Sequence, residues 1–145
     1  MKILDVTVLM YLNDEGSEFH VPVRDFVERA YADSDVLGLP WHSIVGFLRL
    51  TTRRIGGRTL LSRDQAEHFV STLLSRPNVL VVEPGPRHWR ILTELSAAAG
   101  ARGKLYPDAH LAALAIENGA ELCSADSNFA RFPRLKWTDP TRPPA

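Results

Sequence analysis

The sequence predicts an α/β protein with three layers (α/β/α), in which helices cover both faces of a central parallel sheet of four to five strands. Short apolar or β-branched runs alternate along the chain with longer segments whose apolar residues recur at helical spacing. The chain has 145 residues, 45% of them hydrophobic, which is enough for a domain with its own core. We assign residues 1–139 to this one domain and residues 140–145 to a Pro-rich tail.

The expected strands are short and apolar. They cover residues 2–9, 36–39, 79–82 and 121–125, with residues 136–138 as the candidate fifth strand at an edge. Because strands and helices alternate, right-handed crossovers and parallel pairing follow.

The expected helices are marked by residues that favour helix ends. Pro22 and Pro107 each suit a first helical position, and Ser43 suits a cap for the helix that ends near Gly56 and Gly57. Ser62 and Gln65 have the spacing of a capping box. A further helix is expected from about residue 87 to residue 99.

The overall charge gives no support for tight nucleic-acid binding, because 17 basic residues balance 17 acidic ones. Local basic groups remain, and five arginines bracket one segment: Arg49, Arg53, Arg54, Arg58 and Arg63. The single cysteine, Cys123, excludes an intramolecular disulfide and fits a reducing compartment. With no apolar run long enough to span a bilayer and no signal-peptide pattern, we expect a cytoplasmic protein without a membrane partner.

Three acidic residues carry the functional message. Asp126 lies where a strand is expected to end. An unpaired charge is disfavoured within a parallel sheet, so we place Asp5 at the carboxyl end of the first strand as well. Asp108 lies in the first turn of a helix whose apolar face points to the core. Each alone has a structural interpretation, as a turn residue or as a partner of the helix dipole. Together they map to one end of one sheet.

Three converging carboxylates repel each other unless a cation neutralises them. Hard oxygen ligands without a Cys or His cluster favour Mg²⁺ or Mn²⁺ over zinc. We therefore expect a metal-dependent hydrolase.

Three stretches resemble the PIN-domain ribonucleases, and more narrowly the VapC toxins of bacterial toxin–antitoxin pairs. They are Ile-Leu-Asp-Val-Thr-Val-Leu-Met near the start, Pro-Asp-Ala-His-Leu-Ala-Ala-Leu from residue 107, and Ser-Ala-Asp-Ser-Asn-Phe from residue 124. The resemblance covers nearly the whole chain. It implies a PIN-like nuclease domain and an Mg²⁺- or Mn²⁺-dependent endoribonuclease that cuts structured RNA, typically tRNA or rRNA, by metal-activated water. It also implies a VapB antitoxin as partner.

By position, the resemblance makes Asp5, Asp108 and Asp126 the metal-binding and catalytic carboxylates. Thr7 stands where such proteins often have Asn and could support Asp5, and Asn128 stands where Asp is frequent. A fourth acid, usually Glu, is replaced by Gly46. Three formal charges favour one metal ion over two, and the loss puts the catalytic rate in question more than the fold.

RNA contacts and association are expected elsewhere on the surface. Arg49, Arg53 and Lys104 are candidates for binding the RNA backbone, and Tyr106 for stacking on a base. Solvated charge and a half-buried ring are equally compatible with these four residues. VapC-like proteins usually dimerise through helices, so we expect a homodimer or a larger toxin–antitoxin complex. Four aromatic residues add to this expectation: Trp41, Phe47, Phe69 and Trp89.

Two other function classes stay open. The first is an aspartate-based phosphatase or receiver domain, although a dehalogenase-type phosphatase needs Asp where Thr7 stands. The second is a PIN-like binding or regulatory module that lost its activity at Gly46.

Overall fold

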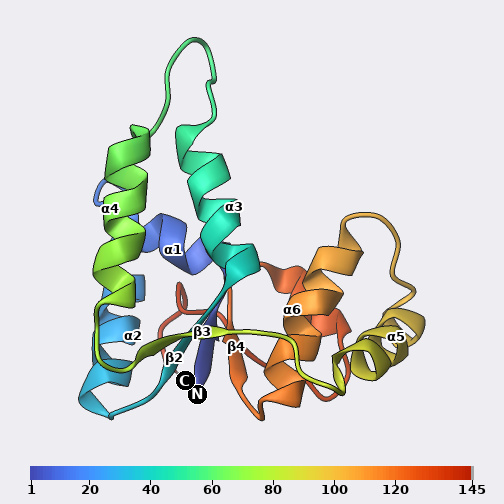
Figure 1. Ribbon diagram of the computed structural model, residues 1–145. Coiled ribbons are helices and arrows are strands. Elements are labelled where there is room, and N and C mark those ends of the chain that lie inside the picture. The colour runs from blue at the N-terminus through green and yellow to red at the C-terminus, as the bar shows by residue number, and fades with distance from the viewer. Residues whose placement is uncertain (145) are drawn as a thin grey trace.

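The protein is built around a sheet of five strands in a computed structural model that describes residues 1–144 (Figure 1). Residue 145, the last of the predicted tail, lies outside the described residues. The elements in chain order are β1 (Lys2–Leu4), α1 (Val6–Asn13), α2 (His20–Ala32), β2 (Leu37–Pro40), α3 (Trp41–Thr52), α4 (Arg63–Leu74), β3 (Val79–Val82), α5 (His88–Ala99), α6 (Leu105–Glu117), β4 (Glu121–Cys123), the 3₁₀ helix η1 (Ser127–Arg131) and β5 (Lys136–Thr138).

The strand order is β3-β2-β1-β4-β5, and all four pairings are parallel. This confirms the predicted α/β class and the parallel sheet, with five strands. In the central pair, Leu4 of β1 lies opposite Cys123 of β4. The two strands therefore end at the same level, and the residues that follow them meet at one edge of the sheet.

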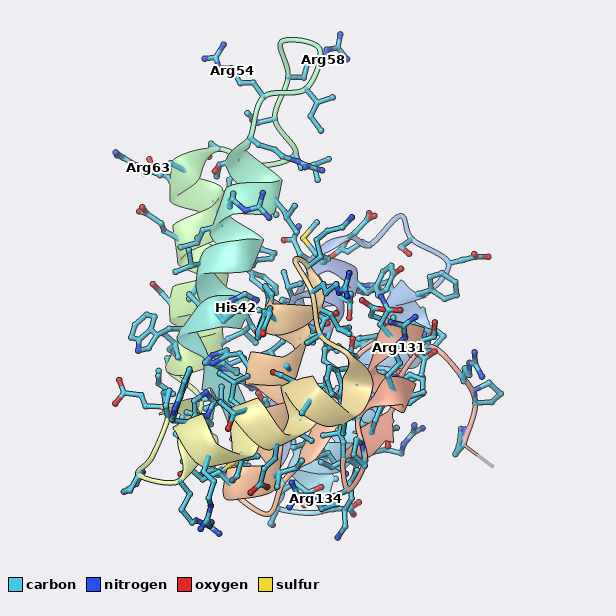
Figure 2. All side chains as sticks on the ribbon, turned by 90° about the vertical axis from the view of Figure 1, so that its right-hand side faces the viewer. His42, Arg54, Arg58, Arg63, Arg131 and Arg134 are labelled. Atoms are coloured by element: carbon cyan, nitrogen blue, oxygen red, sulfur yellow. The ribbon has the colours of Figure 1, made fainter. Side chains whose placement is uncertain are left out.

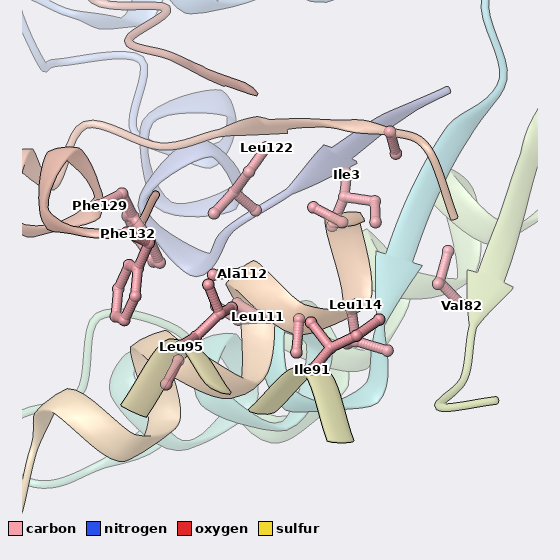
Figure 3. Close-up of a cluster of buried hydrophobic side chains, with 14 of the residues drawn as sticks. Ile3, Val82, Ile91, Leu95, Leu111, Ala112, Leu114, Leu122, Phe129 and Phe132 are labelled. Carbon is pink, nitrogen blue, oxygen red and sulfur yellow. The ribbon is translucent and has the colours of Figure 1, made fainter. Parts of the chain in front are cut away.

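Two hydrophobic clusters pack on opposite faces of the sheet. Ile3 and Leu122 belong to the cluster under α5 and α6 (Figure 3), whereas Leu4 and Cys123 belong to the cluster under α1 to α4. Successive side chains of a strand point to opposite faces, so each central strand supplies both clusters. All four side chains are buried.

The predicted first strand, residues 2–9, is wrong beyond Leu4, because α1 begins at Val6. Asp5 is the N-cap of α1 with an extended backbone, and its carbonyl oxygen accepts from the Val8 amide at 3.0 Å. The β-branched run after Asp5 favours a strand by propensity. Burial of Val8 and Leu9 under α2 and α3 stabilises a helix instead.

Several predicted helix ends also shift. Ser43 is not a cap: α3 begins at Trp41, and the buried Ser43 hydroxyl finds no partner within the described chain. Pro107 lies in the third position of its helix rather than the first, and α2 begins two residues before Pro22. The capping box of Ser62 and Gln65 is confirmed in both directions, at 3.1 and 2.9 Å.

The four aromatic residues divide between core and surface. Phe47 is fully buried and stacks near Phe69, so these two serve core packing rather than association. Trp41 and Trp89 are exposed by 51% and 74%. Among residues 1–144, no helix combines the length and apolar character needed to cross a bilayer.

Glu121 gives the sheet a pH-dependent contribution to stability. Burial raises its pKa, but hydrogen bonds from Thr138 and Lys2 and the Lys2 charge lower it overall below 4.5. The Lys2 ammonium lies 3.0 Å from the Glu121 carboxylate. A depressed folded-state pKa means that the contribution is complete above the unfolded pKa and is lost as the pH falls through the folded value.

We expect Glu121→Gln to lower the free energy of unfolding by about 1 kcal/mol at pH 7, since a partly buried ion pair is lost. Urea denaturation from pH 7 down to pH 3.5 should show this difference shrinking toward zero. Glu94→Gln is the matched control, because Glu94 pairs with Arg134 on an exposed surface and should change stability little. A loss for Glu121→Gln that stayed constant over this pH range would contradict the assignment.

Candidate active site

Asp5 lies directly at the carboxyl end of the central strand β1. Its amide donates to the Cys123 carbonyl oxygen at 3.0 Å, the last bond between β1 and β4. The chain then turns into α1, so the Asp5 side chain projects at the edge of the sheet. It is only 5% exposed, an unusual degree of burial for a carboxylate.

Two hydroxyl groups hold the Asp5 carboxylate. The Ser124 hydroxyl donates to Asp5 Oδ2 at 2.6 Å, and the Thr7 hydroxyl donates to the same oxygen at 3.3 Å. Thr7 Oγ1 also accepts from the Ala125 amide at 3.0 Å, which ties the start of α1 to the segment after β4. Both hydroxyls use one carboxylate oxygen and leave Oδ1 of Asp5 available.

Asp126 follows β4 by three residues and caps η1. Its amide donates to Ser124 Oγ at 3.0 Å, so one buried serine contacts the segments of both strand-end acids. Its Oδ1 accepts from the Asn128 amide at 2.9 Å. Asn128 therefore contacts Asp126 through its backbone, and its own side chain is exposed.

Asp108 joins this pair from the first turn of α6. Burial, and then the negative charges of Asp126 and Asp5 in that order, together raise its pKa to about 6. The pKa of Asp5 is raised mainly by burial, against the hydrogen bonds from Ser124 and Thr7, and Asp126 adds to the rise. The three acids thus lie within one another's electrostatic field, as the sequence predicts.

The donor set suits a hard cation. Within residues 1–144, neither Asp126 Oδ2 nor either oxygen of Asp108 accepts a hydrogen bond, and a cation would relieve the repulsion that helps to raise the pKa of Asp108. In the present geometry, no three His, Cys, Asp or Glu side chains of that part of the chain are close enough to hold a metal ion. Binding would require side-chain rotation.

The wall beside Asp5 is formed by α3. A Cβ atom on Gly46 would lie 3.4 Å from Val6 Cγ2, so this glycine packs directly against the first residue of α1. Gly46, Val6, His42 and Arg49 line a pocket of about 380 Å³. At the position where the family resemblance implies an acid, Gly46 therefore leaves a small apolar surface, and Arg49 lines the same pocket.

Two histidines contact each other between α5 and α6, and one of them, His110, follows Asp108 by two residues. His88 Nε2 and His110 Nδ1 are 2.9 Å apart, and the centroid of the His42 ring lies 5.8 Å from that of His110. Burial, and to a lesser extent the neighbouring His88 and His42, lower the pKa of His110 to about 4. His110 is therefore neutral at pH 7 and joins α5 to α6 without adding positive charge.

The remaining predicted residues lie farther from the acids. Lys104 is exposed at the N-cap of α6. Tyr106 is 50% exposed and lines a different pocket, about 490 Å³ in volume, together with Trp89 and Arg102. Arg53 is exposed at the C-cap of α3.

Two residues near the acids, Ser124 and His110, were not predicted from the sequence. Ser124 was part of a motif, but nothing in the motif indicated that its hydroxyl binds Asp5. Its place just after an apolar strand and before Asp126 was the available signal. His110, two residues after Asp108, lies near His42 and His88 only in the folded chain.

Comparison with known proteins shows the family of the chain. The PIN domain family model matches residues 2–135. Ribonuclease VapC43 of Mycobacterium tuberculosis is 39% identical over 140 residues, which cover 97% of this chain and 95% of that protein. Ribonuclease VapC37 of the same species is 36% identical, with 97% of each chain covered.

Solved structures share the fold at low sequence identity. VapBC2 from Rickettsia felis, solved bound to a DNA fragment from its promoter, has a TM-score of 0.73 at 14% identity and covers 94% of this chain and 96% of its own. VapC20 of M. tuberculosis, described as a toxin that cleaves the sarcin-ricin loop, has a TM-score of 0.62 at 18% identity, with 94% and 99% covered. The chain therefore belongs to the PIN-domain family and, within it, to the VapC ribonucleases.

Proposed function

We propose that this protein is a divalent-metal-dependent endoribonuclease and the toxin of a VapBC-type pair. The proposal rests on the placement of Asp5 and Asp126 after the adjacent strands β1 and β4, with Asp108 on α6 close enough for their charges to raise its pKa. Membership of the VapC group supports RNA as the substrate, and the relatives named above are ribonucleases. The proposed compartment is the cytoplasm, where the buried thiol of Cys123 would stay reduced.

Asp5, Asp126 and Asp108 would hold one Mg²⁺ or Mn²⁺ ion through the oxygens that the hydroxyl and amide donors leave available. When bound, such an ion lowers the pKa of a coordinated water and stabilises charge on a phosphate. Three carboxylates without a fourth at Gly46 favour a single ion.

The protein groups would position and deprotonate the nucleophile. Asp108 or Asp126 would accept a proton from the attacking water as its oxygen bonds to phosphorus. The bond from phosphorus to the 3′ oxygen breaks, and that oxygen takes a proton from solvent, which leaves a 5′-phosphate and a 3′-hydroxyl. Ser124 and Thr7 would keep Asp5 in place by donating to its Oδ2, and Asn128 would support Asp126.

The surface near the acids offers contacts for the substrate. Arg49 lines the pocket beside Gly46 and is suited to bind a phosphate close to the cut, with Arg53 one helical turn farther along α3. Lys104 and Tyr106 would contact RNA on the α6 side. Structured RNA, such as tRNA or rRNA, is the proposed class.

Two protein partners are proposed. A VapB-type antitoxin would cover the acidic cleft, since several structural neighbours were solved as VapBC complexes. A homodimer is the second, and the exposed Trp41 and Trp89 would supply apolar contact area.

An inactive PIN-like binding module is the alternative. Gly46 in place of an acid and the absence of a closed metal cluster in residues 1–144 favour it. An aspartate-based phosphatase is a weaker candidate, because Thr7 donates to Asp5 where that chemistry needs an acid.

Activity is tested by incubating the purified protein with total cellular RNA, with Mg²⁺ or with EDTA, followed by mapping of the cut ends. We expect cleavage in Mg²⁺ only, and a loss of at least about 100-fold for Asp5→Asn and Asp108→Asn because each removes a metal ligand. Asp25→Asn, at an exposed acid on α2, should retain activity.

No cleavage with any divalent metal would favour the inactive module. Cleavage that resisted EDTA would contradict the metal-dependent mechanism. An acid-labile phosphate on Asp5 would instead indicate a phosphatase.

We expect Asp108 to lower the stability of the metal-free protein while it serves the proposed metal site. At pH 8 without metal, its carboxylate is ionised although its pKa is about 6, so Asp108→Asn should raise the free energy of unfolding, by about 1 kcal/mol after allowance for solvent screening. Mn²⁺ or Mg²⁺ should raise the Tm of the wild type more than that of the variant. Equal metal-induced shifts in both proteins would place the cation elsewhere.

Ser124→Ala should lower the free energy of unfolding by about 2 kcal/mol, because it removes a donor to a buried carboxylate and leaves the Asp126 amide without its acceptor. Urea denaturation measures this change. Ser96→Ala is the control, since that nearly buried hydroxyl bonds only to the Leu92 carbonyl of its own helix at 2.7 Å. Equal losses for the two variants would show that the bond to Asp5 has no special weight.

A further inference from the structure

We propose that the connection between α3 and α4, residues 53–62, is an RNA-binding arm that contacts the phosphate backbone away from the site of cleavage. This inference rests on the proposed function and extends it to the way the substrate is selected. We call the segment the arginine arm. It projects beyond the ends of both helices, away from the sheet (Figure 1).

The arginine arm has a defined structure. Ile55 and Arg58 exchange both backbone hydrogen bonds, at 2.8 and 3.1 Å. Gly56 and Gly57 between them have φ values of 59° and 78°, which suit the tight turn of a hairpin. At its base, the Leu61 amide donates to the Thr51 carbonyl at 2.9 Å, and the Ser62 capping box starts α4. The hairpin is therefore held in place at both ends.

The arm contributes little to its own fold. Residues 53–60 are all exposed, and nothing lies within 4 Å of the Cβ positions at Gly56 and Gly57. Two large apolar side chains, Ile55 and Leu60, are 63% and 69% exposed. A structured hairpin that buries so little of its own surface is suited to an external partner.

The charge of the arm indicates an anionic partner. Between Asp35 and Asp64 the sequence holds five arginines and no acidic residue, although the whole chain has no net charge. Arg54 and Arg58 lie at the projecting end (Figure 2), and no carboxylate of residues 1–144 is within ion-pair distance of either. Only Arg63, at the start of α4, pairs with Asp64 and Glu67.

Continuity with the acidic site favours RNA over an acidic protein. Arg49 lines the pocket beside Val6, adjacent to Asp5, and Arg53 follows one helical turn along α3 before the hairpin begins. Arginines thus follow one another from the pocket beside Asp5, at Arg49, to the end of the arm, at Arg54 and Arg58. A phosphate backbone carries negative charge at regular intervals, and arginine binds phosphate in a bidentate manner.

The experiment measures RNA binding without cleavage. A fluorescent stem-loop RNA of about 40 nucleotides is titrated, in EDTA, with the Asp108→Asn protein and with the same protein carrying Arg54→Glu and Arg58→Glu. We expect binding to weaken by about tenfold or more, and the slope of log K against log salt to fall by about 1 to 2, as two phosphate contacts are lost. Arg54→Lys with Arg58→Lys should largely preserve the slope.

The matched control changes net charge by the same amount on other surfaces. Arg90→Glu with Lys136→Glu alters two exposed residues of α5 and β5 that make no ion pair within the described chain. It should weaken stem-loop binding by less than about twofold. Circular dichroism melts of all variants check that each protein remains folded.

Equal weakening by the two charge-reversed pairs, or no weakening by the arm pair, would overturn the proposal. Unchanged RNA binding together with lost binding of a polyglutamate probe would also overturn it, in favour of an acidic protein partner. These results remain separate from the proposed nuclease function. The nuclease proposal is wrong if the wild type does not cut RNA in Mg²⁺. The proposal of an RNA-binding arm is wrong if RNA affinity does not change when Arg54 and Arg58 are replaced.

Discussion

Repulsion among three carboxylates is the constraint on which the site depends. Asp5 and Asp126 follow adjacent parallel strands and Asp108 approaches from α6, so the Asp126 charge raises the cost of ionising Asp5, and both charges raise the cost of ionising Asp108. The Ser124 hydroxyl, 2.6 Å from Asp5, offsets part of that cost with a buried hydrogen bond and also accepts from the Asp126 amide. The fold therefore spends stability to keep negative oxygens together, as a cation-binding site requires.

The register of the central strands determines whether these acids can meet. Leu4 lies opposite Cys123, so Asp5 and Ser124 leave the sheet side by side. A slip of one residue in either strand would turn the side chains of that strand to the other face, moving Ile3 or Leu122 out of the cluster that packs on α6. The packing of the core and the geometry of the site thus depend on the same pairing.

The sequence was sufficient for the fold class, and it mapped Asp5 and Asp126 to one edge of the sheet, whereas a metal site formed by the three acids stays a prediction. Alternating strands and helices, with Asp5 and Asp126 at strand ends, predicted the edge where they meet. It was insufficient where tertiary packing overrides propensity, as in α1, whose β-branched residues predicted a strand. The Ser124 contact links residues 119 positions apart, and no local pattern reports it.

The neutral histidines and Gly46 help to explain why no cationic side chain neutralises the three acids. His88 and His110 join α5 to α6, and His110 follows Asp108 by two residues. Mainly because of burial, the pKa of His110 is about 4, so its ring is neutral at pH 7 and provides no positive charge to pair with the carboxylates. Gly46 adds no side chain to the facing wall. The arginines on this side are Arg49 of α3 and Arg53 at its C-cap, and they lead from the acids toward the arginine arm. Under the proposed function, a cation would balance the carboxylates and an RNA backbone would balance the arginines, so the two sets of charges would act on one RNA without neutralising each other.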